Sequence, residues 1–555
     1  MKKRLVSALL VFVLAVSLGG AALAVQPDIK YIDFGKAESY YALYFSEGLA
    51  EAIIDGNYGF IDKNGKIVIE PKYYYTYGFC EGLAAVCIVN ENGYFKWGFI
   101  DKTGKVVVPL EYDSVCNFSN GFAAVWKDGK MGFVDKTGKL VVPTQYESTW
   151  EEYYVFDSGR AVVPSGKFED PDFKVIDETG KTVFSLNYDY AATSYSEGML
   201  VVGNGGDWSA SKEWDYRYYS GGKYGFVDTN GKEIVAPIYD YVEDFHDGIA
   251  VVWKDNRVGA IDKTGKVVVP IIYLSASERG SEGLLCVCNE DGLWGYVDYT
   301  GKVVIDFKYD WCSDCNEGYV NNSIDYRWGL LDKTGKVAIP FEYDMVYECH
   351  EGLVAFSIFL DDGYFYVGEH TGYMDTSGRV IIDPVYDYFT DFSDGVAIVM
   401  KDNKYGIISK TSIRFTGIPT ASTVLVNGSP VAFDAYNIND NNYFKLRDLA
   451  YVLSGTGKQF EVSWDQDKQA INLITGKPYT AIGGEMSTGK KSNAVAQLST
   501  ATVYINGEKV QLTAYNIDGN NYFKLRDLGK AFDFGVIWDG AANTIRIDTS
   551  VGYSE

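Results

Sequence analysis

The stretch Trp97-Gly98-Phe99-Ile100-Asp101-Lys102-Thr103-Gly104-Lys105 decides the fold, because it recurs along most of the chain. It returns almost unchanged as Met131-Gly132-Phe133-Val134-Asp135-Lys136-Thr137-Gly138-Lys139. With the first glycine as the marker, copies start at residues 59, 98, 132, 174 (a degenerate copy with Lys174), 225, 259, 295, 329, 372 and 406. The markers lie 34 residues apart or somewhat more. One supersecondary unit is therefore repeated about ten times.

Nearly every copy contains a four-residue turn between an aspartate and a glycine, as in Asp101-Lys102-Thr103-Gly104. Aspartate at the first position of such a turn accepts backbone N–H bonds, and glycine at the fourth position tolerates a positive φ. β-branched residues flank the turn, as in Lys266-Val267-Val268-Val269-Pro270. The pattern predicts an antiparallel hairpin with a type I turn and a glycine bulge. With one strand upstream, as in Asp247–Val252, we expect about three short strands in each copy.

These copies resemble the bacterial WG-repeat family, named for the pair seen at Trp97-Gly98, Trp294-Gly295 and Trp328-Gly329. In other copies the tryptophan is replaced by Tyr58, Met131, Tyr224, Val258 and Tyr405. The resemblance covers residues 40–412 and implies an exported or surface interaction array. We expect a mainly β array of about ten antiparallel β-hairpin repeats at residues 25–411. Because the insertions between copies are unequal, an open solenoid is favoured over a closed propeller-like ring.

A second repeat follows a linker at residues 412–422. The stretch from Ala435 to Leu449 returns 79 residues later as Ala514 to Leu528. Each copy predicts an Asn-Gly hairpin, a further strand, a short helix and a closing hairpin. We expect two small α+β modules at residues 423–475 and 501–549, with a linker at residues 476–500.

The Tyr-Phe-Lys-Leu-Arg-Asp-Leu motif of these modules is similar to the copper amine oxidase N-terminal-like (stalk) domain of exported bacterial proteins. Oxidase chemistry in that family needs three histidine copper ligands and an Asn-Tyr-Asp/Glu motif. The three histidines here are His246, His350 and His370, with no His-x-His pair. Asn187-Tyr188-Asp189 does occur, but Tyr188 stands eight residues after a turn glycine, where other copies also have tyrosine. No oxidase activity is expected.

The N-terminus predicts export. Residues 1–24 read as a signal peptide with Lys2-Lys3-Arg4, an apolar run from Leu5 to Leu18, and Ala22-Leu23-Ala24 as the cleavage site. No later stretch approaches twenty uninterrupted apolar residues, so no transmembrane insertion is expected. The net charge of −25 argues against nucleic acid as a partner. An extracellular or cell-surface location is expected.

Several residue types leave alternatives open. The eight cysteines, including Cys312 and Cys315 in a Cys-x-x-Cys spacing, are read first as small buried hydrophobes, then as disulfides, and last as a metal or redox site. The turn aspartates are read as turn caps rather than a calcium ladder, because most precede lysine. The Arg447-Asp448 and Arg526-Asp527 pairs are read as ion pairs or helix-end contacts. No cofactor and no metal site are expected.

Aromatic residues are the candidate ligand contacts. The marker tryptophans and the repeated tyrosines are expected in the core of the array. Surplus aromatics outside the repeat register are the candidate ligand-binding residues: Tyr74, Tyr75, Tyr77, Trp214, Tyr216, Tyr218 and Tyr219. Aromatic rings of this kind stack on sugar rings, and repeated sites reinforce one another.

The sequence shows no nucleophile elbow, phosphate-binding loop or His-Glu-x-x-His motif. We therefore expect an exported, noncatalytic surface or secreted protein. Its array would bind a protein or an envelope polysaccharide, and its C-terminal modules would serve as a tether or spacer. A purely structural envelope or matrix spacer is the alternative, and an enzyme with an unrecognised site is a third possibility.

Overall fold

The computed structural model describes residues 29–31, 40–147, 154–167, 170–210, 217–361, 366–438, 441–466, 468, 470–487, 492–510 and 512–554. They form two compact units. The array unit comprises Lys30–Arg379 and Pro384–Ile407. The C-terminal unit is formed mainly by Ile408–Glu555. Each unit is described by itself.

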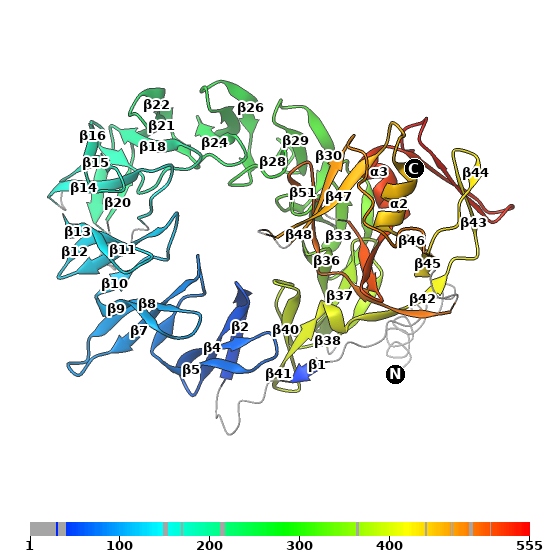
Figure 1. Ribbon diagram of the computed structural model, residues 1–555. Helices are drawn as coiled ribbons and strands as arrows, with labels where there is room; N and C mark the ends of the chain where they lie inside the picture. Colours follow the sequence, from blue (N-terminus) through cyan, green and yellow to red (C-terminus); the bar gives the residue numbers. More distant parts are fainter. Residues whose placement is uncertain are drawn as a thin grey trace. The chain divides into compact units, whose positions relative to one another are not determined.

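The array unit contains ten successive sheets, one for each copy of the repeat, which Figure 1 shows following one another. Sheets one to four are β2 (Tyr40–Ser46), β3 (Leu49–Ile54), β4 (Asn57–Asp62) and β5 (Ile67–Tyr73); β6 (Tyr75–Thr76), β7 (Leu83–Val89), β8 (Phe95–Asp101) and β9 (Val106–Tyr112); β10 (Ser114–Val115), β11 (Phe122–Lys127), β12 (Lys130–Asp135) and β13 (Leu140–Glu147); β14 (Ala161–Lys167), β15 (Asp170–Ile176) and β16 (Thr182–Leu186). Sheets five to seven are β17 (Tyr190–Ala191), β18 (Met199–Asn204), β21 (Lys223–Asp228) and β22 (Glu233–Tyr239); β23 (Tyr241–Val242), β24 (Ile249–Lys254), β25 (Arg257–Asp262) and β26 (Val267–Tyr273); β27 (Ser275–Ala276), β28 (Leu284–Cys288), β29 (Trp294–Asp298) and β30 (Val303–Tyr309).

Sheets eight to ten are β31 (Trp311–Cys312), β32 (Tyr319–Ile324), β33 (Arg327–Asp332) and β34 (Val337–Tyr343); β35 (Met345–His350), β36 (Leu353–Asp361), β37 (Tyr366–Asp375) and β38 (Val380–Tyr386); β39 (Tyr388–Phe389), β40 (Val396–Lys401), β41 (Lys404–Ser409) and β1 (Ile29–Tyr31). A separate hairpin of β19 (Asp207–Ala210) and β20 (Arg217–Ser220) lies in the insertion of the fifth copy. The mainly β array of about ten hairpin repeats is confirmed. A short first strand, usually of two residues, adds to the three expected strands of most sheets.

The repeated turn has the geometry expected from the sequence. In the second sheet the Gly104 amide donates to the Asp101 carbonyl at 2.9 Å, and the Asp101 amide donates to the Lys105 carbonyl at 2.9 Å. The Asp101 side chain accepts from the amides of Thr103 and Lys105 at 2.9 and 3.1 Å. Gly104 has a φ of 81°. The aspartate therefore caps the turn, and glycine supplies the left-handed residue.

The marker glycine is required by a close approach of two strands. A Cβ on Gly98 would lie 2.4 Å from the Val108 carbonyl oxygen and 2.6 Å from the Pro109 carbonyl oxygen. The same clash with the neighbouring strand would occur at Gly59, Gly132, Gly225 and Gly259. The Trp-Gly pair thus combines a ring opposite the repeated tyrosine, as in Trp97 opposite Tyr112, with a position that has no room for a side chain.

A ladder of hydrogen bonds joins successive sheets. An acidic residue in the tight turn before the second strand accepts from the amide of the equivalent glycine one sheet further on, as Gly318 donates to Glu282 at 3.1 Å. The ladder comprises Glu47 with Gly82, Glu81 with Gly121, Glu197 with Gly248, Asp247 with Gly283, Glu282 with Gly318, Glu317 with Gly352 and Glu351 with Gly395. Asn120 and Ser158 stand at the acidic position in the third and fourth sheets and interrupt the ladder. The Asn120 side-chain amide donates instead to the Phe156 carbonyl at 2.8 Å, and the Ser158 hydroxyl donates to Asp157 at 2.6 Å.

The same ladder closes the array, which corrects the expected open solenoid. Gly48 in the first sheet donates to Asp394 in the tenth at 2.6 Å, and the Ser393 hydroxyl donates to the Phe45 carbonyl at 3.2 Å. One hydrophobic cluster joins Phe45, Ala50 and Ile61 of the first sheet with Val396, Ile398 and Ile407 of the tenth. In addition, β1 supplies the fourth strand of the tenth sheet. The first and last copies thus meet as neighbouring copies do elsewhere in the array.

The C-terminal unit interleaves the two copies of the second repeat. A six-stranded closed barrel contains β42 (Arg414–Pro419), β45 (Ala435–Ile438), β46 (Asn441–Lys445), β53 (Asn520–Lys524), β52 (Ala514–Ile517) and β49 (Ala494–Leu498). Two four-stranded sheets flank it: β44 (Ser429–Pro430), β43 (Thr423–Val426), β55 (Thr544–Asp548) and β54 (Gly535–Asp539); β47 (Phe460–Asp465), β48 (Ala470–Thr475), β50 (Thr502–Ile505) and β51 (Glu508–Val510). The helices are η1 (Lys410–Ser412), α2 (Leu446–Leu453) and α3 (Leu525–Phe532).

Both predicted helices are present, at the positions expected from their apolar spacing. Leu446, Leu449 and Leu453 of α2 share one core with Leu525 and Leu528 of α3. Strand β43 of the first copy pairs in parallel with β55 of the second, and β48 pairs with β50 in the same way. The two copies therefore form a single core rather than two separate ones.

Candidate functional site

The first three candidate residues form part of an exposed aromatic cluster in the array unit. Tyr74, Tyr75 and Tyr77 lie at the start of the second sheet, and each exposes 44% of its surface. We define the aromatic cluster as these three residues together with Tyr58, Phe95 and Trp97. Tyr58 comes from β4 of the first sheet, and Phe95 and Trp97 come from β8 of the second. The cluster thus bridges two copies of the repeat.

The rings of the cluster form two contacting groups, one of Tyr77 with Trp97 and one of the other four rings. Tyr74 packs edge-on against Tyr75 with centroids 4.7 Å apart, and it contacts Phe95 at 5.0 Å. Tyr77 stacks on Trp97 at 5.0 Å with an interplanar angle of 20°. Tyr58 contacts Tyr75 at 5.7 Å. Aromatic contacts of this kind hold the rings in place while leaving apolar faces open to solvent.

The repeat itself does not require this cluster. In six later copies the residue after the repeated tyrosine is an aspartate: Asp113, Asp189, Asp240, Asp310, Asp344 and Asp387. Asp113 shows the structural role, because it accepts from the Asp128 amide at 2.8 Å and pairs with Lys96 at 2.6 Å. Tyr74 replaces this aspartate and contacts Phe95 instead. An exposed aromatic group therefore stands where the fold ordinarily places a capping carboxylate.

Two phenols of the cluster have raised pKa values. Burial raises the pKa of Tyr77, and burial together with the nearby Glu51 carboxylate raises the pKa of Tyr58. Glu51 is itself half-buried, accepts from the Thr76 hydroxyl at 2.5 Å, and has its pKa raised by burial. The hydroxyl groups of Tyr58 and Tyr77 are therefore hydrogen-bond donors at neutral pH.

Sequence reasoning missed two exposed aromatics next to the predicted residues. Tyr94 and Phe95 expose 68% and 47% of their surfaces. They follow a turn in which Asn90 accepts from the amides of Asn92 and Tyr94 at 3.0 and 2.9 Å. The signal was present as a copy interval of 39 residues rather than 34, which lengthens the hairpin between β7 and β8.

The second predicted group is placed only in part. Trp214 and Tyr216 lie outside the described residues. Tyr218 and Tyr219 fall in β20, where their backbones pair with Ser209 and Trp208 of β19. Among the described residues, Tyr74, Tyr75 and Tyr77 thus lie together at the start of the second sheet, whereas Tyr218 and Tyr219 belong to the hairpin of the fifth copy.

The expected core aromatics are buried or half-buried. Tyr73, Tyr112, Tyr239, Tyr273, Tyr309 and Tyr386 are buried, whereas Trp97, Trp294 and Trp328 are half-buried. Exposed aromatics also stand beside the markers of later copies. The ring of Trp311, for example, lies 5.0 Å from that of Trp328, and the ring of Tyr241 lies 6.2 Å from that of Tyr224. The aromatic cluster of the second sheet is the largest member of a recurring arrangement.

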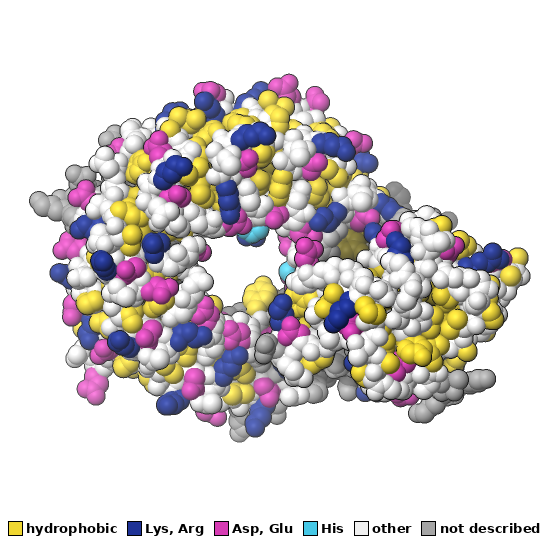
Figure 2. All heavy atoms as spheres, turned by 45° about the horizontal axis from the view of Figure 1, so that its top comes forward, with side chains coloured by type: hydrophobic (Ala, Val, Ile, Leu, Met, Phe, Trp, Pro, Cys, Tyr) yellow, Lys and Arg dark blue, Asp and Glu magenta, His cyan; other side chains and the backbone are white. Residues whose placement is uncertain are grey.

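Charged groups on the array are mostly used within it. The repeat lysines pair with acids of the ladder, as Lys102 with Glu47 and Lys263 with Glu197, both at 3.0 Å. Figure 2 shows one face of the molecule, on which Lys and Arg are interspersed with Asp and Glu. That face shows no large patch of one sign.

The cysteines serve the packing of the array. Cys286 and Cys312 form a disulfide between the seventh and eighth sheets, and the other six cysteines are not in disulfides, five of them being buried. Burial raises the pKa of Cys315 to about 12 and that of Cys87 to about 11, so these thiols stay protonated. Cysteines of this kind are unreactive. In the Cys-x-x-Cys motif, Cys312 is thus disulfide-bonded to Cys286, whereas Cys315 is a buried thiol.

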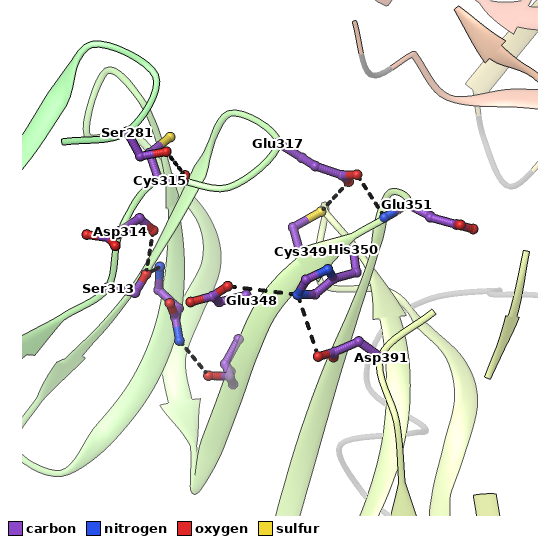
Figure 3. Close-up of polar contacts among 12 residues, drawn as sticks. Ser281, Ser313, Asp314, Cys315, Glu317, Glu348, Cys349, His350, Glu351 and Asp391 are labelled. Carbon is purple, nitrogen blue, oxygen red and sulfur yellow. Dashed lines mark hydrogen bonds and ion pairs between the residues drawn. The ribbon is translucent and has the colours of Figure 1, made fainter. Parts of the chain in front are cut away.

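Polar groups around the ninth sheet stabilise the joints between copies. Figure 3 shows His350 between Glu348 and Asp391, at 3.8 and 3.5 Å, while the Cys349 thiol points to Glu317. The histidine and the thiol thus contact different carboxylates and do not form a nucleophile with its base. Among the residues that the structure describes, no group of three or more His, Cys, Asp or Glu side chains is arranged to hold a metal ion.

The repeat is matched by a family model described as WG containing repeat. The nine matched segments are residues 58–92, 97–130, 131–163, 175–208, 224–257, 259–293, 294–325, 328–358 and 372–405, more than half of the chain. The chain belongs to the WG-repeat family. The last WG-repeat match ends at residue 405, within β41 of the tenth sheet.

Other comparisons add little about function. Solved structures similar to this WG-repeat chain include apo AztD from Citrobacter koseri, with 13% identity and a TM-score of 0.23 over 55% of this chain and 96% of that one. A second structure of Citrobacter koseri AztD has 11% identity and a TM-score of 0.23, over 55% and 94%. A search of curated proteins finds no match. Within the described ranges, no helix is long and apolar enough to cross a membrane.

Proposed function

We propose that this WG-repeat protein is an exported, noncatalytic surface or secreted protein whose array binds a cell-envelope polysaccharide through the aromatic cluster. The observation that carries the proposal is the replacement of the capping aspartate by Tyr74, in contact with the exposed ring of Phe95. The fold does not need these rings in solvent. Sugar rings stack on exposed aromatic faces, and phenol hydroxyls donate hydrogen bonds to sugar oxygens.

The recurrence of exposed aromatics supports binding to an extended ligand. Tyr241 and Trp311 expose nearly half of their surfaces beside marker positions of later copies. A polymer that contacts several copies at once gains affinity from the high effective concentration of each further contact. A polysaccharide of repeating sugars fits a surface of repeating aromatic positions better than a single small ligand does.

Export rests on the predicted signal peptide at residues 1–24, which lies outside the described residues. The disulfide between Cys286 and Cys312 supports this part of the proposal, because disulfides persist in oxidising compartments. The C-terminal unit would serve as a tether or spacer, as the similarity of its motif to the copper amine oxidase N-terminal-like (stalk) domain suggests.

The test uses the full chain and a variant with Tyr74→Ala, Tyr75→Ala and Phe95→Ala. Binding to purified peptidoglycan and wall polysaccharide is measured by sedimentation, with Tyr326→Ala as the control, since Tyr326 is an exposed tyrosine in a turn of the eighth sheet. We expect about a tenfold loss of affinity in the triple variant and none in the control. Equal binding by both variants contradicts the proposal. If the protein binds neither polymer but binds saturably to washed cells, and protease treatment of the cells abolishes this binding, the ligand is a protein instead.

A further inference from the structure

The C-terminal unit contains a pocket of about 700 Å³ that the proposed function does not use. Its lining includes Lys524 and Arg526 at the start of α3, Trp538 of β54, and Asn437 and Asn442 of the barrel. The Trp538 ring exposes 47% of its surface. Asn442 is fixed in place, because its side-chain oxygen accepts from the Thr420 hydroxyl at 2.9 Å. Two cations, a flat ring and fixed amides thus face one space.

The internal repeat gives this pocket a twin. Lys445, Arg447 and Trp464 of the first copy occupy the places of Lys524, Arg526 and Trp538 in the second. The asparagine site is also duplicated, since the Ser499 hydroxyl donates to Asn521 at 3.1 Å as Thr420 does to Asn442. The parallel pairing of β43 with β55 and of β48 with β50 relates the two halves. Equivalent residues of the two copies therefore line the two sites.

The cationic side of the twin site is covered by the chain itself, whereas Trp464 still exposes 44% of its surface. The inter-copy loop, residues 476–487, crosses that side: the Lys445 ammonium donates to the Gly484 carbonyl at 3.4 Å, and Arg447 lies beside Tyr479. The Met486 amide donates to Asp448 at 3.0 Å. Within the loop, the Tyr479 hydroxyl donates to Glu485 at 2.8 Å. The cations of the first copy thus meet a peptide that carries a tyrosine, a main-chain carbonyl and a nearby carboxylate.

The pocket of the second copy has no such cover. Among the described residues, no hydrogen bond or ion pair engages the exposed Arg526 guanidinium. Asp527, beside it, accepts from the Thr513 amide at 3.2 Å, and no ion pair joins the two side chains among the described residues. Of the two readings expected for Arg526-Asp527, an ion pair or a helix-end contact, the ion pair is therefore not formed. An uncompensated guanidinium next to a flat ring favours a carboxylate or carbonyl ligand, which it can bind through two N–H groups.

We propose that this pocket binds an acidic, tyrosine-containing peptide segment of a partner protein, in the manner in which the inter-copy loop covers the twin site. The partner segment would place a tyrosine hydroxyl on Arg526, a main-chain carbonyl on Lys524 and an acidic side chain close by. Peptide is favoured over sugar because the occupant of the twin site is peptide. The proposal does not depend on the aromatic cluster of the array.

The probe is a labelled peptide with the sequence of residues 477–487, titrated with the full chain in a fluorescence anisotropy assay. We expect saturable binding that Arg526→Ala weakens about tenfold, and that Arg414→Ala, at an exposed arginine outside the pocket, leaves unchanged. Peptides with Glu485→Gln or Tyr479→Phe are expected to bind more weakly. Far-UV circular dichroism confirms that each variant is folded.

Three results would overturn the proposal. The first is an absence of saturable peptide binding, and the second is equal binding by Arg526→Ala and the unchanged protein. The third is Arg526-dependent binding of an acidic oligosaccharide, such as oligogalacturonate, with no binding of the peptide, which would assign the pocket to a sugar. The triple variant of the aromatic cluster is expected to bind the peptide normally, so failure here is distinguishable from failure of the proposed polysaccharide binding.

Discussion

At the scale of single residues, the repeat is constrained most strongly where two backbones touch. The marker glycine faces carbonyl oxygens of the next strand, whereas the aromatic residue before it is replaced by Met131 and Val258 in other copies. A packing position accepts several side chains of suitable size, but a Cβ contact at 2.4 Å leaves no room for one. The degenerate fourth copy has Lys174 at this position, and its strand pairing lacks the bulge that the second sheet has there. The fold therefore depends more on the marker glycine than on the tryptophan before it, although the family is named for both residues.

The substitution Gly98→Ala tests this assignment. The new methyl group would meet the Val108 and Pro109 carbonyl oxygens, so we expect a loss of about 3 kcal/mol in the free energy of unfolding. The control is Gly78→Ala, where the nearest atom to a Cβ is the Ser46 Cβ at 3.8 Å. Urea denaturation followed by intrinsic fluorescence measures both. A similar loss in the two variants would mean that the marker position is not sterically special.

At the scale of elements, the hairpin turn is the part of the fold that the sequence specified best. Asp, Lys, Thr and Gly in the turn act within five residues of one another, so their hydrogen bonds follow from local sequence. The joints between sheets were not predicted. The carboxylate of Glu282 reaches an amide 36 residues away, and the disulfide partner of Cys286 lies 26 residues away. A local sequence pattern does not predict contacts between residues that lie this far apart along the chain.

The candidate site was predictable to the same extent. Tyr74, Tyr75 and Tyr77 stand out because they break the repeat register. Phe95 belongs to β8, and only folding of the chain brings its ring against Tyr74 at the start of the second sheet. The open pocket and its covered twin depend on the interleaving of two copies, which a tandem sequence does not reveal.

The turns also predict a response to acid. At Asp101, Asp177 and Asp262, a threonine hydroxyl donates to the turn aspartate at 2.6 Å. This hydrogen bond is the leading cause that holds the pKa of each carboxylate below its usual value. A lowered pKa in the folded state means that the unfolded chain binds more protons. This contribution to stability is therefore complete above the usual pKa of 3.8 and is lost as the pH falls through the folded value.

The variant Thr264→Val removes one of these hydroxyl bonds. We expect a lower melting temperature than that of the unchanged protein at neutral pH, and a difference that shrinks as the pH is lowered below the usual aspartate pKa. Calorimetry across this range measures it, with Thr416→Val, at an exposed threonine of β42, as the control. A difference that is constant with pH would show that the hydroxyl acts through packing and not through the carboxylate.

At the scale of the whole molecule, closure makes the first and last copies neighbours. Asp394 accepts from Gly48 and lies 3.9 Å from Lys63, so it connects the tenth sheet to the first as Glu282 connects the seventh to the eighth. Unequal insertions do not prevent this closure, because they lengthen hairpins and loops without changing the joints. The angle between successive sheets decides between an open and a closed array, and no residue encodes that angle by itself.

The substitution Asp394→Gly tests closure. Glycine tolerates the φ of 56° at this position, so the variant removes the side chain without straining the turn. We expect about 1 to 3 kcal/mol of destabilisation and faster amide exchange in both the first and the tenth sheets. Asp402→Gly is the matched control, since Asp402 has a φ of 49° in the hairpin between β40 and β41. Faster exchange confined to the tenth sheet would contradict closure.

The strand β1 has a consequence for the order in which the protein is made. It is synthesised first, yet its partner strand β41 belongs to the last copy of the array. Nine sheets can form during translation while the tenth stays incomplete, and the first strand waits for a partner from the end of the array. A chain truncated before the last copy keeps an unpaired edge at each end, open to pairing with other chains or to proteases. Completion of the tenth sheet thus separates finished molecules from unfinished ones.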